Sequence, residues 1–255
     1  MVMGPGGKPA RPPGPADIGI VAALSIEIAP LISRLRDVRK YAGERLTVIE
    51  GELGDQLIAV VVAGAGRKRA QIGAEILIDG HRPRWIISAG FGGALSPDLH
   101  RGDIVLADEV MNLEGGRFAI DVAVPPPVPG QPAIRAGRLL TVDEIIRTAA
   151  EKAELHARTG ASVVDMETSS VAALCGERGV RFLSVRVISD EAGVDLPPEV
   201  VAILGRSGGL RLGAAVGAIW KRPSSMKDLL LLRDHARSAA DRLSAFLSAT
   251  MGQLT

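Results

Sequence analysis

Short apolar runs of strand length alternate with helical patterns along most of this chain. Ile18 to Leu24 is an apolar run that turns polar at Ser25 and Glu27 and continues as a helical pattern to about Arg36. Later strand-like runs lie at Arg84 to Ser88, at Asp103 to Ala107, and near Leu139, Val163 and Phe182. This alternation predicts an α/β fold with a central sheet that is mixed and largely parallel, flanked by helices.

The chain length and hydrophobic content indicate one domain. With 255 residues and 47% hydrophobic content, the chain can bury a full core. Residues 1–16 are rich in Gly and Pro and are predicted to form a disordered tail. Residues 17–255 are predicted to form the domain, with a helical C-terminal part over 210–251. A long amphipathic pattern there, from Lys227 to Leu247, favours core packing, with a dimer face or a surface for a lipidic substrate as alternatives.

Charge and composition exclude several classes of protein. Thirty basic and 29 acidic residues give a net charge of +1, so nucleic acid is not an expected partner. No apolar run reaches the roughly 18 residues of a membrane span, and we expect a cytoplasmic protein. The single cysteine, Cys175, lies in an apolar helical pattern and is predicted to be a buried thiol. No metal site is predicted, because the histidines are scattered: His81, His100, His156 and His235.

Carboxylates stand at the ends of two hydrophobic strands. One strand leads into Asp165 and Glu167, and the other ends at Asp190. A strand buried on both faces accommodates a charged side chain only near its end. We therefore expect Asp165, Glu167 and Asp190 to converge on one pocket at the carboxyl edge of the sheet, as active-site residues of α/β proteins do.

Two glycine-rich turns are predicted to approach a ligand. Gly64-Ala-Gly66 follows a strand and opens a helix, so its backbone N–H groups could hold an anion, aided by Arg67 and Arg69. The alternative is a tight turn with solvated basic residues. The second turn, Gly90-Phe-Gly-Gly93, also follows a strand and would let a flat ligand approach the backbone, or would simply be a bend.

Five blocks of the sequence, in order, resemble the nucleoside phosphorylases and 5′-methylthioadenosine/S-adenosylhomocysteine nucleosidases. The resemblance implies a three-layer sandwich and cleavage of the N-glycosidic bond of a purine nucleoside, with no cofactor other than phosphate as a possible co-substrate. The blocks are Ile18-Gly-Ile-Val-Ala-Ala-Leu-Ser-Ile-Glu27, Gly64-Ala-Gly66, Ile87-Ser-Ala-Gly-Phe-Gly-Gly-Ala-Leu95 with Gly102-Asp-Ile-Val105, Val164-Asp-Met-Glu167 and Val185-Arg-Val-Ile-Ser-Asp190.

The resemblance also implies roles for individual residues. Asp190 would donate a proton to N7 of adenine while the ribose gains oxocarbenium character, with its pKa raised by partial burial. Ser189 could orient Asp190. Glu167 would accept hydrogen bonds from the ribose hydroxyls, and Met166 would pack against the sugar. The structural alternative is that Asp190 and Glu167 cap helices.

The attacking group is left open between water and phosphate. In the nucleosidases a glutamate at the place of Glu27 activates water, whereas phosphorolysis needs a cationic site such as Gly64, Gly66, Arg67 and Arg69 could form. Glu27 could also be an ordinary first-turn carboxylate. Hydrolysis is favoured, because a carboxylate beside a phosphate dianion would repel it unless protonated or bridged by an arginine.

Two features bear on the substrate. Where nucleosidases carry a base-stacking phenylalanine, this chain has Ile145, and Phe91 beside Gly90 is the candidate replacement. The region from Leu196 onward, with Trp220-Lys-Arg-Pro223, resembles the branch associated with hopanoid biosynthesis, which acts on an adenosyl-hopane. We expect a 5′-substituted adenosine as substrate and a homodimer or higher homo-oligomer. A noncatalytic nucleoside-binding module is the rival interpretation, which an intact Asp190 disfavours.

Overall fold

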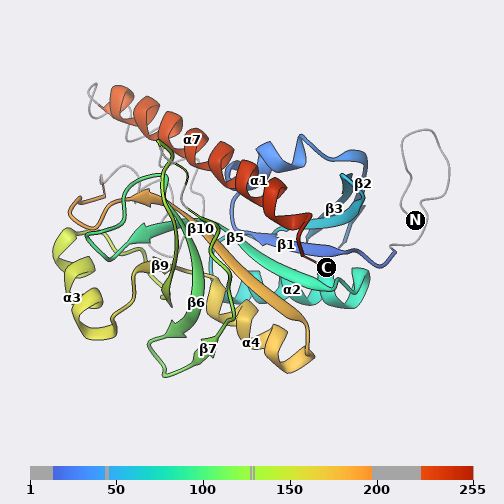
Figure 1. Ribbon diagram of the computed structural model, residues 1–255, viewed down its shortest axis with the longest axis horizontal. Helices are drawn as coiled ribbons and strands as arrows, with labels where there is room; N and C mark the ends of the chain where they lie inside the picture. The colour runs from blue at the N-terminus through green and yellow to red at the C-terminus, as the bar shows by residue number, and fades with distance from the viewer. Residues whose placement is uncertain (1–13, 44–45, 127, 129, 197–224, 255) are drawn as a thin grey trace.

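The computed structural model describes residues 14–43, 46–126, 128, 130–196 and 225–254. A mixed β-sheet lies between two helical layers (Figure 1). Helices α1 (Ser25–Ile32) and α7 (Ser225–Met251) pack together over one face, and α2 (Arg67–His81) and α4 (Thr168–Arg178) cover the other. Helix α3 (Ala149–Thr159) lies at one end of the sheet. The α/β class predicted from the alternating pattern is confirmed.

The strands combine parallel and antiparallel neighbours. β1 runs parallel to β4 and β5, β5 runs parallel to β10, and β8 runs parallel to β6 and β9. The other pairings are antiparallel and include the hairpin of β3 and β4. The strands are β1 (Ile18–Ala22), β2 (Arg36–Ala42), β3 (Thr47–Leu53), β4 (Gln56–Val62), β5 (Trp85–Ala94), β6 (Ile104–Asn112), β7 (Arg117–Ala119), β8 (Ile134–Thr141), β9 (Val163–Asp165) and β10 (Arg181–Asp190).

Strand β5 pairs with three other strands and connects the two parts of the sheet. Its first half pairs with β1, its end pairs with β9, and β10 follows it along almost its whole length. Because β10 also pairs with β6, and β8 links β6 to β9, strands β5, β9, β8, β6 and β10 close into a ring. The carboxyl ends of β1, β5 and β10 are thereby brought to one region of the molecule.

Two local predictions were wrong. The cluster from Gly90 to Gly93 is not a turn, because it continues β5 to Ala94 as the strand leaves β1 for β9. Helix α1 ends at Ile32 rather than near Arg36, because a turn over 33–35 precedes strand β2. Strand β2 is almost wholly exposed and rich in charge, so no apolar alternation marks it in the sequence.

Alternating side chains of the strands face the two helical layers. Ile18 and Ile20 of β1 pack with α1 and α7, whereas Val21 faces α2 and α4. Cys175 of α4 belongs to the second cluster, and burial raises the pKa of its thiol to about 12, as befits the predicted buried thiol. The sheet core is therefore continuous on both faces.

Several predictions concern residues at the limits of the described chain. Residues 1–13 of the predicted tail and 197–224 lie outside the described residues, and with them Trp220 to Pro223. Ala16, at the end of the predicted tail, is buried, and its N–H donates to the carbonyl of His81. In the described part of the chain, no helix combines the length and apolar character needed to cross a bilayer.

Candidate active site

Glu27 is a buried carboxylate at the start of α1, directly after β1. Its Oε2 accepts hydrogen bonds from the backbone N–H groups of Ala23 at 3.1 Å and Leu24 at 2.7 Å. Its Oε1 accepts from the N–H of Phe91 at 2.9 Å. Burial raises the pKa of Glu27, while these three N–H donors and the positive charge of Arg186 oppose the increase. Glu27 is thus a buried carboxylate held by three backbone N–H groups.

The absence of a side chain at Gly90 allows Glu27 to reach β5. A Cβ atom added at Gly90 would lie 2.7 Å from Oε1 of Glu27, closer than real Cβ contacts permit. The glycine predicted to admit a ligand therefore admits the carboxylate of Glu27. Any larger residue at position 90 would push this carboxylate off its bond to the Phe91 N–H.

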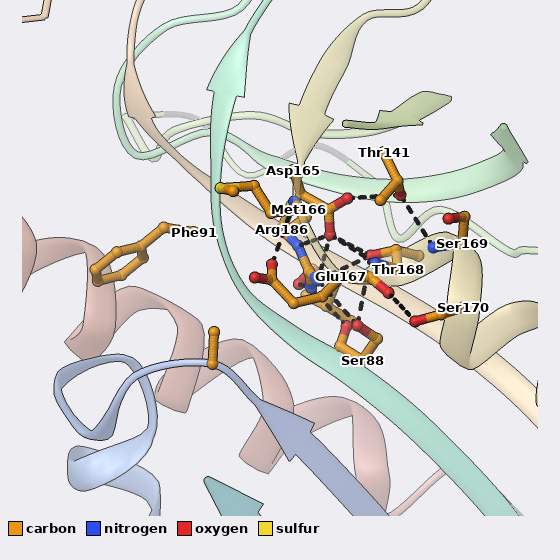
Figure 2. Close-up of polar contacts among 12 residues, drawn as sticks. Ser88, Phe91, Thr141, Asp165, Met166, Glu167, Thr168, Ser169, Ser170 and Arg186 are labelled. Carbon is orange, nitrogen blue, oxygen red and sulfur yellow. Dashed lines mark hydrogen bonds and ion pairs between the residues drawn. The ribbon is translucent and has the colours of Figure 1, made fainter. Parts of the chain in front are cut away.

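Arg186 and Asp165 form a buried ion pair beneath the site. Arg186, in the middle of β10, donates to Oδ2 of Asp165 from Nη2 at 2.7 Å and from Nε at 3.1 Å. Further bonds link the pair to Ser88 of β5 and to Thr168, the first residue of α4 (Figure 2). Thr141 of β8 donates to the other oxygen of Asp165 at 2.8 Å. Asp165 is fully engaged by these donors.

Glu167 is the second carboxylate of the site and is half-buried. Its Oε1 accepts from the N–H of Gly66 at 2.8 Å, and its Oε2 from the N–H of Met166 at 3.3 Å. Burial, together with the nearby negative charge of Asp165, raises its pKa to about 8, against the opposing charge of Arg186. The surroundings of Glu167 therefore favour its protonated form.

Glu27 and Glu167 line one narrow cavity. Arg186 belongs to the same lining, and its positive charge acts on both carboxylates. The lining is completed by the end of β1 and the middle of β5: Val21, Ala22, Ala23, Ser88, Ala89 and Gly90. The cavity thus lies at the carboxyl end of β1, a position at which α/β sheets bind their ligands. Of the three carboxylates expected to converge, Glu167 is in this lining, whereas Asp165 pairs with Arg186 and Asp190 is not among the lining residues.

Asp190 stands at the end of β10 with both of its oxygens engaged. The hydroxyl of Ser189 donates to Oδ1 at 2.6 Å, and Nζ of Lys152 donates to Oδ2 at 2.7 Å. The same carboxylate lies beside Gly93 of β5, where an added Cβ would be 3.2 Å from Oδ2. Ser189 thus lies where it was expected to orient Asp190, and Lys152 is an additional partner.

The basic residues after Gly66 do not form an open cationic cluster. Arg67 is held by two carboxylates: Glu114, at 2.8 and 2.9 Å, and Asp143, at 2.8 Å from Nε with a second contact from Nη2. These carboxylates raise the pKa of Arg67, so its charge is permanent but already paired. Arg69 lies over Gly64 and lines a different hollow with Leu46, Ala63 and Ile72. Gly64 and Gly66 have φ of 84° and 104°, and the N–H of Gly66 is bound to Glu167.

The remaining predicted contacts lie around the buried cluster. Phe91 lies apart from the Glu167 and Arg186 side chains (Figure 2) and packs partly against the core beneath α1 and α7. Met166 is half-buried between Asp165 and Glu167. Ile145 is half-buried in the irregular segment between β8 and α3. The structure places Phe91 on the same strand as Gly90, on the Glu27 side of the site.

Sequence reasoning missed Arg186 and Lys152. Arg186 left a usable signal, because a charge inside the apolar run Val185-Arg-Val-Ile must pair with a buried carboxylate. Lys152 left none, because it is one of several charged residues in a helix whose other charges are exposed. Within the described ranges, no group of three or more His, Cys, Asp or Glu residues is arranged to hold a metal ion.

Solved structures resemble this fold closely. The 5′-methylthioadenosine/S-adenosylhomocysteine nucleosidase of Neisseria meningitidis, solved with methylthio-immucillin-A, aligns with a TM-score of 0.67 and 18% identity over 91% of this chain and 98% of its own. A futalosine hydrolase mutant of Helicobacter pylori aligns with a TM-score of 0.63 and 17% identity, over 93% and 99%. At these identities the likeness establishes the fold.

Sequence comparison establishes the family. A 5′-methylthioadenosine/S-adenosylhomocysteine nucleosidase of Mycobacterium tuberculosis is 26% identical over 222 residues, which span 70% of this chain and 87% of the relative. One from Oceanobacillus iheyensis is 27% identical over 199 residues, 69% of this chain and 86% of the relative. The family profile described as "Phosphorylase superfamily" matches residues 17–207, about three quarters of the sequence. The chain belongs to the phosphorylase superfamily.

Proposed function

We propose that this protein hydrolyses the N-glycosidic bond of a 5′-substituted adenosine and releases adenine. The observation that carries the proposal is that two carboxylates, the buried Glu27 and the half-buried Glu167, line one cavity at the carboxyl end of β1 and beside the middle of β5. In glycoside hydrolysis one carboxylate activates the water and another protonates the leaving group, and Glu27 and Asp190 are assigned these two roles. The relatives named as nucleosidases support a purine nucleoside as the substrate.

The roles follow from the chemistry of the bond. Glu27 takes a proton from the water that attacks C1′, and its raised pKa makes it a stronger base than an exposed glutamate. Glu167 hydrogen-bonds the ribose hydroxyls. Asp190 gives a proton to N7 as the C1′–N9 electron pair passes to the base. Met166, Phe91, Gly90 and Ile145 are the candidate contacts to sugar and base.

Water is favoured over phosphate because the cationic groups at the site are already paired. Arg67 is bound by Glu114 and Asp143, and Arg186 by Asp165. Two further carboxylates, Glu27 and Glu167, line the cavity itself. A phosphate dianion placed there would find no unpaired arginine among Arg67 and Arg186 to hold it.

The proposal is tested by following adenine release from 5′-methylthioadenosine. The wild-type protein should release adenine, and Asp190→Asn should lower the rate of release far more than tenfold while nucleoside binding is retained. The amide keeps the shape of the carboxyl group but carries no acidic proton. A wild-type protein that binds the nucleoside without releasing adenine would support the noncatalytic alternative. An Asp190→Asn variant within about tenfold of wild type would refute the assigned acid.

A further inference from the structure

Lys152 is a lysine with no exposed surface. It lies in the first turns of α3, and its side chain reaches toward the end of β10. Its Nζ donates to Oδ2 of Asp190 at 2.7 Å, to the carbonyl of Glu191 at 2.8 Å and to the carbonyl of Val194 at 3.0 Å. An ammonium has three N–H donors, so each is used.

A buried ammonium must be compensated by an opposite charge. Lysine is almost never fully buried unless it is paired, because removal of its charge from water costs several kcal/mol, on the order of the penalty for any buried ion. The compensating charge here is the carboxylate of Asp190, of which 15% remains exposed. Lys152 is thus hidden behind Asp190, while Asp190 retains an accessible edge.

The surroundings fix Lys152 in place. Helix α3 starts with a capping box in which Thr148 and Glu151 satisfy each other's backbone N–H groups. The segment after β10 is tied to the same helix start, because Asp195 accepts from the N–H of Ala149 and the N–H of Leu196 donates to the carbonyl of Arg147. With Ser189 on its other oxygen, Asp190 is held from two sides.

We propose that Lys152 is a positioning residue for departure of the base, an inference that rests on the proposed function. Lys152 holds the carboxyl group of Asp190 at the end of β10 and stabilises the carboxylate formed there. As the C1′–N9 bond breaks, its electron pair goes to the base and the proton of Asp190 moves to N7. The negative charge left on Asp190 restores its ion pair with the Lys152 ammonium, and Asp190, ionised in that pair, takes up a proton from solvent water through its exposed edge before each turnover.

The proposal predicts a dependence on the leaving group. Lys152→Met keeps the length of the side chain and removes the charge, and Lys40→Met, at an exposed lysine on β2, is the matched control. Two substrates are compared: 5′-methylthioadenosine, whose base must be protonated, and 4-nitrophenyl β-D-ribofuranoside, whose phenolate leaves without a proton. Lys152→Met should lower kcat about 100-fold on the first and less than about threefold on the second. Lys40→Met should match wild type on both.

A double variant separates this role from a purely structural one. If Lys152 acts through Asp190, adding Lys152→Met to Asp190→Asn should reduce kcat on 5′-methylthioadenosine no further. The double variant also avoids a buried unpaired carboxylate, so it remains testable where Lys152→Met alone unfolds. A further loss of about tenfold or more in that background, or equal losses on both substrates, would overturn the proposal. Lack of adenine release by the wild type would instead overturn the proposed function.

Discussion

Nη2 of Arg186 lies 2.7 Å from Oδ2 of Asp165, and both side chains are at most 3% exposed. The pair joins β10 to the end of β9 and supports the floor of the cavity that Glu27 and Glu167 line. The charges of Arg186 and Asp165 cancel, so Glu27 and Glu167 are the carboxylates that remain in the cavity. The geometry of the site therefore depends on this ion pair being intact.

Loss of Arg186 should destabilise the fold strongly. Arg186→Met leaves the Asp165 carboxylate buried without a partner, and we expect a decrease of about 3–5 kcal/mol in the free energy of unfolding. Adding Asp165→Asn should recover part of this loss, because the unpaired charge is removed. Chemical denaturation measures both variants.

The matched control is Arg84→Met, which removes an arginine from a largely exposed ion pair with Asp17. That pair should contribute at most about 1 kcal/mol. If Arg186→Met and Arg84→Met unfold at similar denaturant concentrations, the buried pair does not support the site as described.

The pKa of Glu167, raised from 4.5 to about 8, should make stability depend on pH. Between these values the folded protein binds a proton that the unfolded chain has released, so the free energy of unfolding falls as pH rises. The contribution of Glu167 is fully present below about pH 4.5 and is lost by about pH 8. Glu167→Gln cannot titrate, and its stability should decline less over that range. If the stability of the two proteins changed equally with pH, the raised pKa of Glu167 would be contradicted.

Glu167 should also discriminate the sugar. If its carboxylate accepts hydrogen bonds from the ribose hydroxyls, Glu167→Gln should impair cleavage of ribonucleosides far more than that of 2′,3′-dideoxy analogues. The dideoxy substrates lack the hydroxyls that this residue contacts, so the substitution should change their rate of cleavage little. Steady-state kinetics on both substrate classes provides the comparison, and equal impairment would refute the role.

Glu27→Gln should remove most of the activity without preventing nucleoside binding. The amide cannot accept a proton from the attacking water, and no other carboxylate among the residues that line the cavity lies on the Glu27 side. Activity within about tenfold of wild type, with binding retained, would show that Glu27 is not the base. A thermal melt checks that the bonds from Ala23, Leu24 and Phe91 tolerate the substitution.

Elements marked by apolar runs could be predicted from the sequence, whereas those marked by charge could not. β1, β4 and the start of β5 read as strands because they are buried on both faces. β2 is exposed, and its sequence contains four charged residues among seven, so it carries no such pattern. The cluster from Gly90 to Gly93 has the composition of a turn, yet tertiary pairing with β9 and β10 makes it strand.

For the candidate site too, some residues could be predicted from the sequence and others could not. Glu27, Glu167 and Asp190 could be located because each stands where an apolar strand ends. The pairing of Arg67 could not be predicted, because its partners Glu114 and Asp143 lie 47 and 76 residues away in the chain. The Lys152 contact likewise spans 38 residues and depends on how α3 meets the end of β10. Such contacts follow from the packed fold rather than from local spacing.

The central claim, hydrolysis of a nucleoside by water activated at Glu27, is tested most directly by identifying the sugar product. Wild-type protein is incubated with 5′-methylthioadenosine in the presence and absence of phosphate, and adenine and sugar are separated and quantified. The account predicts adenine and free 5-methylthioribose in equal amounts, at the same rate in both conditions, and the same product from Arg67→Ala. A sugar 1-phosphate that forms only when phosphate is added, and less readily with Arg67→Ala, would contradict it.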